Sequence, residues 1–393
     1  MNYNVTSTRF SAIVATLLLL VAPAHVSAQT IRPDQLTLPS SSPTPPLSSA
    51  PVSDSAEGSE QETVYGLQGV LVETLDGKTI SMQSADKAFN PASTIKLATA
   101  LVALRTFGPD HRFTTGVWTT GTLDKTTGTL TGDLYISGRD PSFHYEHAVM
   151  VARQLNLLGI RTVTGNLIVA PGFTLNFNWS ARRAGELFYD TLDSSRRPGE
   201  AMRAWLYERN ALADKASLQT VPSVAVMGEV QINPVPSAAR LLLSQKSSRL
   251  VDILKVFLCY SNNFMAERLG DTLGGVQSVT AQITNSLKLA PDDLRIATLS
   301  GLGVNRVSPR TMMKIYRALR EELRKNKLST TDILPVAGVD PGTLEDRFKD
   351  LPWRGSVIAK TGTLARTDGG ASALVGQMKT ASGETLLFVI MNR

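Results

Sequence analysis

Alternating apolar and polar positions predict that the folded region begins with a β-hairpin that leads into a helix. Residues 67–74 alternate as a strand does, Asp76-Gly77 suits the turn, and residues 79–82 form the return strand. The helix is expected to begin at Pro91, because the fixed φ of proline is already helical and its missing N–H is not needed in a first turn. Good helix formers continue it as far as Gly108-Pro109, which end it.

Between residues 113 and 233 the pattern changes to short apolar runs separated by Gly and Thr turns. Strands are predicted at residues 115–120, 132–137, 166–169 and 224–232, and helices at residues 147–158 and within residues 185–212. This mixture of short strands and helices differs from the pattern of the segments on either side of it. We therefore expect a β-rich insert at residues 113–235, which splits one domain into residues 62–112 and 236–393.

Helical spacing dominates from residue 238 onward, most clearly in the apolar run at residues 250–257. Three closing strands are predicted at residues 354–363, 371–378 and 385–391, the last two joined at Ser382-Gly383. The split domain thus contains strands at both of its ends and helices between them.

The composition is that of a globular protein, with 42% hydrophobic and 19% charged residues among 393. The first 28 residues differ. Arg9 precedes an apolar run at residues 13–21, and Val26-Ser27-Ala28 offers small residues for cleavage. A membrane anchor is the alternative, but the run is shorter than the roughly 20 residues that a span needs. We expect a signal peptide at residues 1–28, a disordered Ser/Pro-rich linker at residues 29–61, and no transmembrane span.

The formal net charge of +6 falls to +5 without Arg9, the one charged residue of the signal, and such a mild excess predicts no nucleic-acid partner. The densest basic run, residues 310–327, has apolar residues on one helix face: Met312, Tyr316, Leu319 and Leu323. A basic amphipathic helix can make peripheral contact with an anionic membrane, although a solvated charged face is the more usual reason for the pattern. Cys259 is the single cysteine, so the fold relies on its core and not on disulfides.

Ser93 and Lys96 lie three residues apart at the expected helix start, so their side chains meet on one face of the first turn. The N–H groups of that turn are unpaired, and the helix dipole there favours negative charge, as on an activated serine oxygen. A Ser-x-x-Lys pair arises by chance about once in a chain of this length, so the pair needs partners elsewhere.

Histidine is scarce, and no Gly-x-Ser-x-Gly elbow is present, so a histidine-dependent triad lacks support. His144 and His147 with Glu146 could suggest a metal site. No distal Cys or His cluster completes it, so we expect a surface pair at a helix start and no metal.

Two short segments offer better partners. Ser261 and Asn263 place a hydroxyl and an amide at a break after an apolar helix, and Lys360-Thr361-Gly362-Thr363 lies on a predicted strand. Gly362 lets another backbone or a ligand approach closely. Singly these residues could be a helix cap and a surface charge, but in this order with Ser93 they form a rarer pattern.

The motifs Ser93-x-x-Lys96, Ser261-x-Asn263 and Lys360-Thr361-Gly362 resemble, in order, those of penicillin-recognising serine enzymes. The wider sequence resembles the class C low-molecular-mass penicillin-binding proteins, which are D-alanyl-D-alanine carboxypeptidases and endopeptidases of the serine β-lactamase/transpeptidase-like superfamily. The matching stretches are residues 89–97, 132–135, 140–142, 261–267, 300–302, 305–309, 336–340 and 359–364. The resemblance implies an α+β fold, an α/β/α sandwich whose antiparallel sheet is flanked by helices and interrupted by a large β-rich insert.

The resemblance also implies the roles of the site residues. Ser93 attacks the carbonyl between two D-alanines, Lys96 is the base, and Ser261 relays a proton to the leaving amine. Burial and the charge of Lys360 are expected to lower the pKa of Lys96. The substrate-binding residues implied are Asn263, Lys360, Thr361, Gly362 and Thr363, with the N–H groups of Ser93 and Thr363 forming the oxyanion hole.

The implied substrates are peptidoglycan peptides that end in D-Ala-D-Ala, with β-lactams as inhibitors and no cofactor. The implied location is the periplasm, or the cell exterior where no outer membrane exists. The family usually has Asp-Gly where Thr298-Leu299 stand here, and a helix after the last strand, which the printed sequence lacks. A serine β-lactamase and a catalytically silent peptidoglycan-binding relative are the alternatives. Glu229 and Asn233 mimic a β-lactamase motif, but they precede Ser261 and alternate as a strand does.

Overall fold

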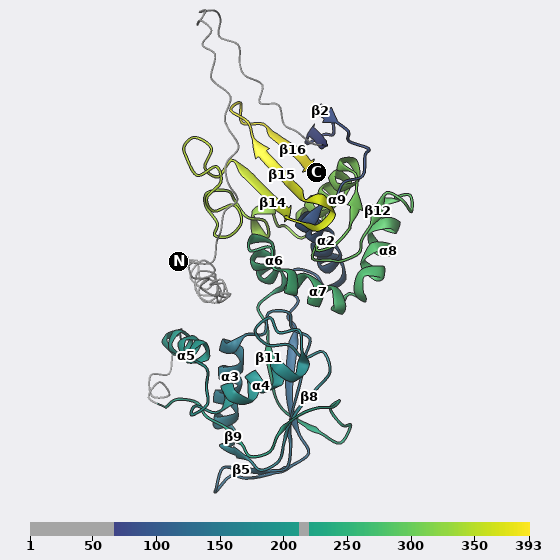
Figure 1. Cartoon of the computed structure of the whole chain (residues 1–393). Coiled ribbons are helices and arrows are strands. Elements are labelled where there is room, and N and C mark those ends of the chain that lie inside the picture. Colours follow the sequence, from purple (N-terminus) through teal and green to yellow (C-terminus); the bar gives the residue numbers. More distant parts are fainter. Residues whose placement is uncertain (1–66, 212–219) are drawn as a thin grey trace, which may run out of the picture.

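The computed structural model describes residues 67–211 and 220–393, so the expected signal peptide and linker lie outside the described residues. Figure 1 shows two lobes. The first lobe is made of residues 67–113 and 247–393, and the second lobe is made of residues 114–211 and 220–246. Each lobe has its own large hydrophobic cluster.

A five-stranded antiparallel sheet organises the first lobe. In spatial order its strands are β14 (Val357–Leu364), β15 (Ala371–Lys379), β16 (Thr385–Asn392), β1 (Gln68–Thr74) and β2 (Thr79–Gln83). The expected hairpin and the three closing strands are confirmed, and β1 pairs with β16 so that the two ends of the described chain lie side by side. The fold is α+β, as expected.

Helices cover one face of this sheet (Figure 1). They are α2 (Lys96–Phe107), α6 (Leu250–Cys259), α7 (Asn263–Thr272), α8 (Gly275–Leu287) and α9 (Pro309–Lys325). Residues 96–104 of α2 are all buried, which fits a helix enclosed by the other four. On the opposite face, Ala337 and Leu344 pack on Val357 and Phe388.

The apolar face of α9 is buried in the core and packs against β1, β15 and β16. The membrane contact suggested for this amphipathic segment is therefore corrected, since the residues that would enter a lipid surface are inside the protein. The remaining basic face is the solvated one. Within the described residues, no helix is both long enough and apolar enough to span a bilayer.

The second lobe contains a mixed five-stranded sheet and a smaller four-stranded one. The larger sheet has the order β10 (Val230–Ile232), β8 (Leu167–Val169), β6 (Leu134–Ser137), β3 (Thr114–Thr119) and β11 (Arg240–Lys246). The smaller has β4 (Thr122–Asp124), β5 (Thr129–Thr131), β7 (Thr162–Val163) and β9 (Ala225–Val226). The helices of this lobe are α3 (Tyr145–Leu157), α4 (Ala181–Leu192) and α5 (Gly199–Ala211).

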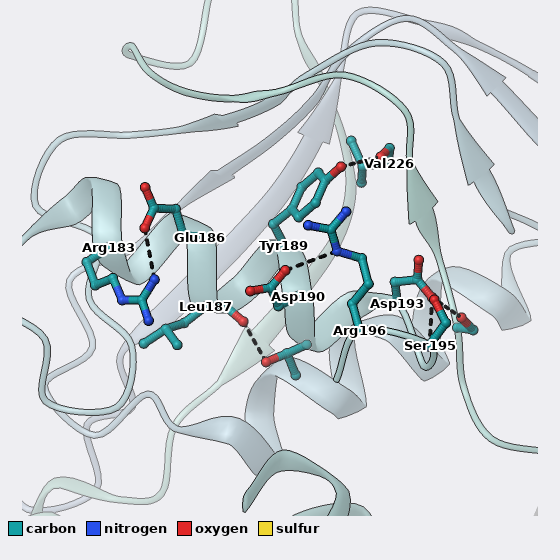
Figure 2. Close-up of polar contacts among 11 residues, drawn as sticks. Arg183, Glu186, Leu187, Tyr189, Asp190, Asp193, Ser195, Arg196 and Val226 are labelled. Carbon is teal, nitrogen blue, oxygen red and sulfur yellow. Dashed lines mark hydrogen bonds and ion pairs between the residues drawn. The ribbon is translucent and has the colours of Figure 1, made fainter. Parts of the chain in front are cut away.

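Polar contacts fix α4 within the second lobe (Figure 2). The Tyr189 hydroxyl donates to the Val226 carbonyl at 2.8 Å, which ties the helix to β9. Arg196 donates to Asp190 at 3.2 Å just beyond the helix, and its guanidinium lies over the Tyr189 ring. These contacts hold a helix of mixed charge against a strand of only two residues.

Residues 240–246 correct one expectation. The sequence predicted helices from residue 238 and placed residues 236–246 with the split domain, yet this segment is β11 and pairs with β3 of the second lobe. Its side chains are mostly exposed or half-buried, so burial alone does not set its conformation. Hydrogen bonding to β3, which lies more than 100 residues earlier, decides the outcome.

Candidate active site

Ser93 lies in a short 3₁₀ turn, η2 (Ala92–Ile95), directly before α2. The sequence predicted a helix from Pro91, and the structure refines this to a tighter turn followed by the helix. The backbone N–H and the hydroxyl of Thr94 both donate to the Pro91 carbonyl, at 3.1 and 2.7 Å. Ala92 has a left-handed φ of 46°, and its N–H donates to Asn90 Oδ1 at 3.1 Å. These bonds fix the turn that presents Ser93.

Lys96 is fully buried, and its ammonium contacts the serine. Its Nζ lies 2.8 Å from Ser93 Oγ and 2.8 Å from Asn263 Oδ1, and it also donates to the Ser300 carbonyl. Burial lowers the pKa of Lys96 to about 7, with the charge of Glu267 opposing the shift. Lys96 is therefore partly neutral near pH 7 and can accept a proton there.

The Ser261 segment turns sharply between α6 and α7. Ser261 has a left-handed φ of 55°, and Asn262 Oδ1 accepts from the Met265 N–H at 2.9 Å, which caps α7. The cap that the sequence suggested for this stretch is thus made by Asn262. Asn263, the first residue of α7, is left to contact Lys96.

β14 passes directly over the serine turn. A Cβ on Gly362 would lie 2.7 Å from the Pro91 carbonyl oxygen and 3.1 Å from the Ser93 nitrogen, so glycine is required at this position. Lys360 is fully buried, and its ammonium donates to the Thr361 carbonyl at 2.7 Å. Burial and the nearby charge of Lys96 hold the pKa of Lys360 well below its usual value. Thr361 is nearly buried, whereas Thr363 is exposed.

A loop that the sequence did not assign to the site completes it. The Ser300 carbonyl accepts from Lys96 and from Ser93 Oγ, the latter at 3.3 Å, and its N–H donates to Glu267 Oε1 at 2.7 Å. Gly301, with φ of 88°, passes so close to the serine turn that a Cβ would overlap the Ala92 carbonyl. Glu267 and residues 300–302 lie in stretches that carried the family resemblance. That resemblance was the signal by which the sequence could have assigned this loop to the site.

His144 and His147 lie at the start of α3. The His144 N–H donates to His147 Nδ1 at 3.2 Å, and His144 Nδ1 lies 3.0 Å from Asn176 Oδ1. The pair thus caps the helix, as expected of a helix start, but His144 is buried, so the expected surface position is corrected for that residue. Across residues 67–211 and 220–393, no group of three or more His, Cys, Asp or Glu residues is placed to hold a metal ion.

The fold and site define a low-molecular-mass penicillin-binding protein of the serine peptidase type, with its serine turn placed between helices and the edge strand of an antiparallel sheet. The sequence matches the D-Ala-D-Ala carboxypeptidase 3 (S13) family over residues 56–177 and 206–393, so the chain belongs to that family.

Curated relatives cover most of the chain. A carboxypeptidase of Mycobacterium tuberculosis is 26% identical in an alignment of 367 positions, gaps included, that covers 83% of this chain and 76% of the relative. A D-alanyl-D-alanine carboxypeptidase of Actinomadura is 26% identical in an alignment of 423 positions, gaps included, that covers 82% of this chain and 77% of the relative. A solved predatory endopeptidase of Bdellovibrio bacteriovorus, acylated by penicillin G, has the same fold, with a TM-score of 0.68, 24% identity, and coverage of 82% and 85%.

Proposed function

We propose that this protein hydrolyses the terminal D-Ala-D-Ala bond of peptidoglycan stem peptides through an acyl-enzyme on Ser93. The observation that carries the proposal is the 2.8 Å contact between Lys96 Nζ and Ser93 Oγ, made by a fully buried lysine whose pKa is about 7. Membership of a carboxypeptidase family supports the substrate class.

In the acylation step, neutral Lys96 accepts the Ser93 hydroxyl proton while Ser93 Oγ attacks the carbonyl carbon between the two D-alanines. The resulting oxyanion is held by the N–H groups of Ser93 and Thr363, and losing one such donor typically costs about 2.7–4 kcal/mol. The C–N bond then breaks, a proton relayed through Ser261 reaches the leaving nitrogen, and the last D-alanine departs.

Hydrolysis of the acyl-enzyme restores the serine. Water adds to the ester carbon, its proton passes to Lys96, and Ser93 leaves as the alcohol. A β-lactam acylates Ser93 in the same way, but its leaving group stays attached and hinders the incoming water. The penicillin G-acylated form of the Bdellovibrio endopeptidase, which has the same fold, supports this part of the proposal.

The substrate is held from two sides in this mechanism. Asn263, which already contacts Lys96, forms a hydrogen bond with the substrate amide. The hydroxyls of Thr361 and Thr363 bind the terminal carboxylate at the edge of the sheet. Lys360 is buried beside them, and the negative charge of a bound carboxylate favours its ammonium form, which then attracts that carboxylate.

Peptidoglycan lies outside the cytoplasmic membrane, so we place the protein in the periplasm, or outside the cell where no outer membrane exists. Export would depend on residues 1–28, whose charged start, apolar run and small-residue end have the pattern of a signal peptide.

The decisive experiment combines a label and a product assay. We expect fluorescent penicillin to label the wild-type protein and not Ser93→Ala, and D-alanine to be released from a muropeptide that ends in D-Ala-D-Ala. Cleavage of cross-linked dimers without D-alanine release would restrict the protein to endopeptidase activity. Absence of label on folded protein would indicate a silent peptidoglycan-binding relative, and rapid turnover of a chromogenic cephalosporin would indicate a β-lactamase.

A further inference from the structure

A cluster behind the serine turn joins three segments of the chain through one carboxylate. Asp368 follows β14 and lies in the 3₁₀ turn η5 (Thr367–Gly369). Its Oδ2 accepts from Arg306 Nη1 at 2.6 Å, and its Oδ1 accepts from Arg306 Nη2 at 2.8 Å. Asn90 Nδ2 donates to Asp368 Oδ2 at 3.4 Å, and Arg393 approaches Oδ1 at 3.9 Å. Two parallel hydrogen bonds from the guanidinium hold the carboxylate in one orientation and also stabilise its negative charge.

Asn90 connects this cluster to the nucleophile. The same side chain accepts from the Ala92 N–H at 3.1 Å and donates to the Gly303 carbonyl at 2.9 Å. Asn90 is nearly fully buried, so its hydrogen bonds are shielded from water. It therefore holds the turn that presents Ser93 and the loop that carries Ser300.

Arg306 connects the cluster to that loop and to the chain before Ser93. It lies in β13 (Arg306–Val307), and its Nη1 also donates to the Asn305 carbonyl at 2.9 Å. The neighbouring Val307 exchanges two backbone hydrogen bonds with Phe89, each 3.0 Å long. The serine turn, the Ser300 loop and the end of β14 thus meet at Asp368.

We propose that Asp368 is a positioning residue that, through Asn90 and Arg306, holds β14 in register with the serine turn. The inference rests on the proposed function, in which the two oxyanion donors, the N–H groups of Ser93 and Thr363, come from these two separate segments. A donor pair of this kind must be held within about 0.5 Å of its productive geometry. A misplacement of about 1 Å can cost about 100-fold in rate.

The local chemistry suits this role. Arg306 beside Asp368 holds the pKa of that carboxyl below its usual value, so the carboxylate stays charged wherever the site is active. Asp368 has a left-handed φ of 61°, a conformation that Asp and Asn tolerate better than most residues. Asp368→Asn therefore keeps the backbone and the shape while it removes the charge and one acceptor oxygen.

The chain offers a matched control pair. Arg317 also donates two hydrogen bonds to one carboxylate, that of Glu73, at 2.9 and 2.6 Å. The exposed side-chain fractions are 28% for Arg317 and 12% for Glu73, against 28% for Arg306 and 10% for Asp368. The Glu73 pair joins α9 to β1, and Glu73 has no role in the proposed site. Glu73→Gln thus removes a similar ion pair without touching the serine turn.

The test measures, for benzylpenicillin, the non-covalent dissociation constant and the rate constant of acylation at pH values on both sides of 7. For Asp368→Asn we expect the acylation rate constant to fall about 10- to 100-fold, with an unchanged dissociation constant. The apparent pKa of the rate profile should not move, because Lys96 is untouched. Glu73→Gln should be acylated at the wild-type rate, even if its melting temperature falls as much as that of Asp368→Asn.

Arg306→Lys provides a second variant, which keeps the charge but cannot donate two parallel bonds, and it should lose part of the rate. Wild-type acylation in Asp368→Asn, or an equal loss in Glu73→Gln, would overturn the inference while leaving the proposed function intact. A wild-type protein that benzylpenicillin does not acylate would overturn the proposed function and this inference with it.

Discussion

The protonation state of one buried lysine controls the proposed chemistry. Lys96 donates to Ser93 Oγ, Asn263 Oδ1 and the Ser300 carbonyl as an ammonium, and only the bond to the Ser93 hydroxyl can reverse when the nitrogen becomes a base. Its low pKa comes from burial, whereas a surface lysine titrates near 10.5. The charge of Lys360 was expected to lower the pKa of Lys96 as well, but burial alone lowers it, and the charge of Glu267 opposes the shift.

The acylation rate should consequently depend on pH with an apparent pKa of about 7. Below that pH Lys96 is an ammonium and cannot accept the Ser93 proton, so the rate should rise with pH and level off above it. Stopped-flow acylation by a reporter β-lactam measures this profile. Lys96→Arg stays protonated and should lose about 10²- to 10⁴-fold in rate. A rate that stays constant through pH 7 would contradict Lys96 as the base.

At the scale of elements, the site is a contact between a 3₁₀ turn and an edge strand. η2 presents Ser93, and β14 lies against it with only a glycine between the two backbones. α2 then anchors the turn, because residues 96–104 of this helix are buried on every side. The positions of the reacting groups therefore depend on how closely η2 and β14 approach each other, and not only on the chemistry of their side chains.

Gly362→Ala tests this approach. The new Cβ would lie 2.7 Å from a backbone oxygen of the serine turn, so β14 must move away and carry Thr363 with it. We expect acylation to fall at least about 100-fold and stability to fall by about 1–3 kcal/mol. Labelling kinetics and chemical denaturation measure the two effects.

Gly199→Ala is the control for this substitution. A Cβ at Gly199 meets open space, so this variant should acylate normally. Normal acylation by Gly362→Ala would show that β14 does not set the geometry of the nucleophile.

The sequence predicted those parts of the site whose chemistry is written in short local motifs. Ser93, Lys96 and Asn263 fall in such motifs, and the structure brings Lys96 within hydrogen-bonding distance of the other two. Ser300 escaped assignment because it contributes a backbone carbonyl, which any residue type has. Asp368 escaped because its partners Asn90 and Arg306 are distant in sequence and common in type. The conformation of β11 was predicted wrongly for a related reason, since its partner strand is remote.

At the scale of the whole molecule, the two lobes pack around separate hydrophobic clusters. The chain passes between them at two neighbouring points. There Phe113 and Ser247 are linked by a backbone bond of 2.9 Å and a side-chain bond of 2.9 Å. The core of the second lobe can therefore be weakened without changing a contact of Ser93.

Phe188→Ala should show this separation. Phe188 is fully buried in the second cluster, so its truncation should destabilise that lobe by about 3–5 kcal/mol. Penicillin acylation by the folded protein should remain within about twofold of wild type, since distant sites rarely couple. Calorimetry and hydrogen exchange would locate the loss. A matching loss of acylation would mean that the two lobes act as a single unit.

The position of β16 has a consequence for the timing of synthesis. This strand is the middle one of the first sheet, yet it is made after all the others, and it pairs Gln68 with Asn392. A sheet whose centre is made after its other strands cannot close until residues 385–392 are available, and such long-range pairing is slow to form. The nucleophile should thus gain its partners on β14 in their final positions only after the last strand of the sheet has been made.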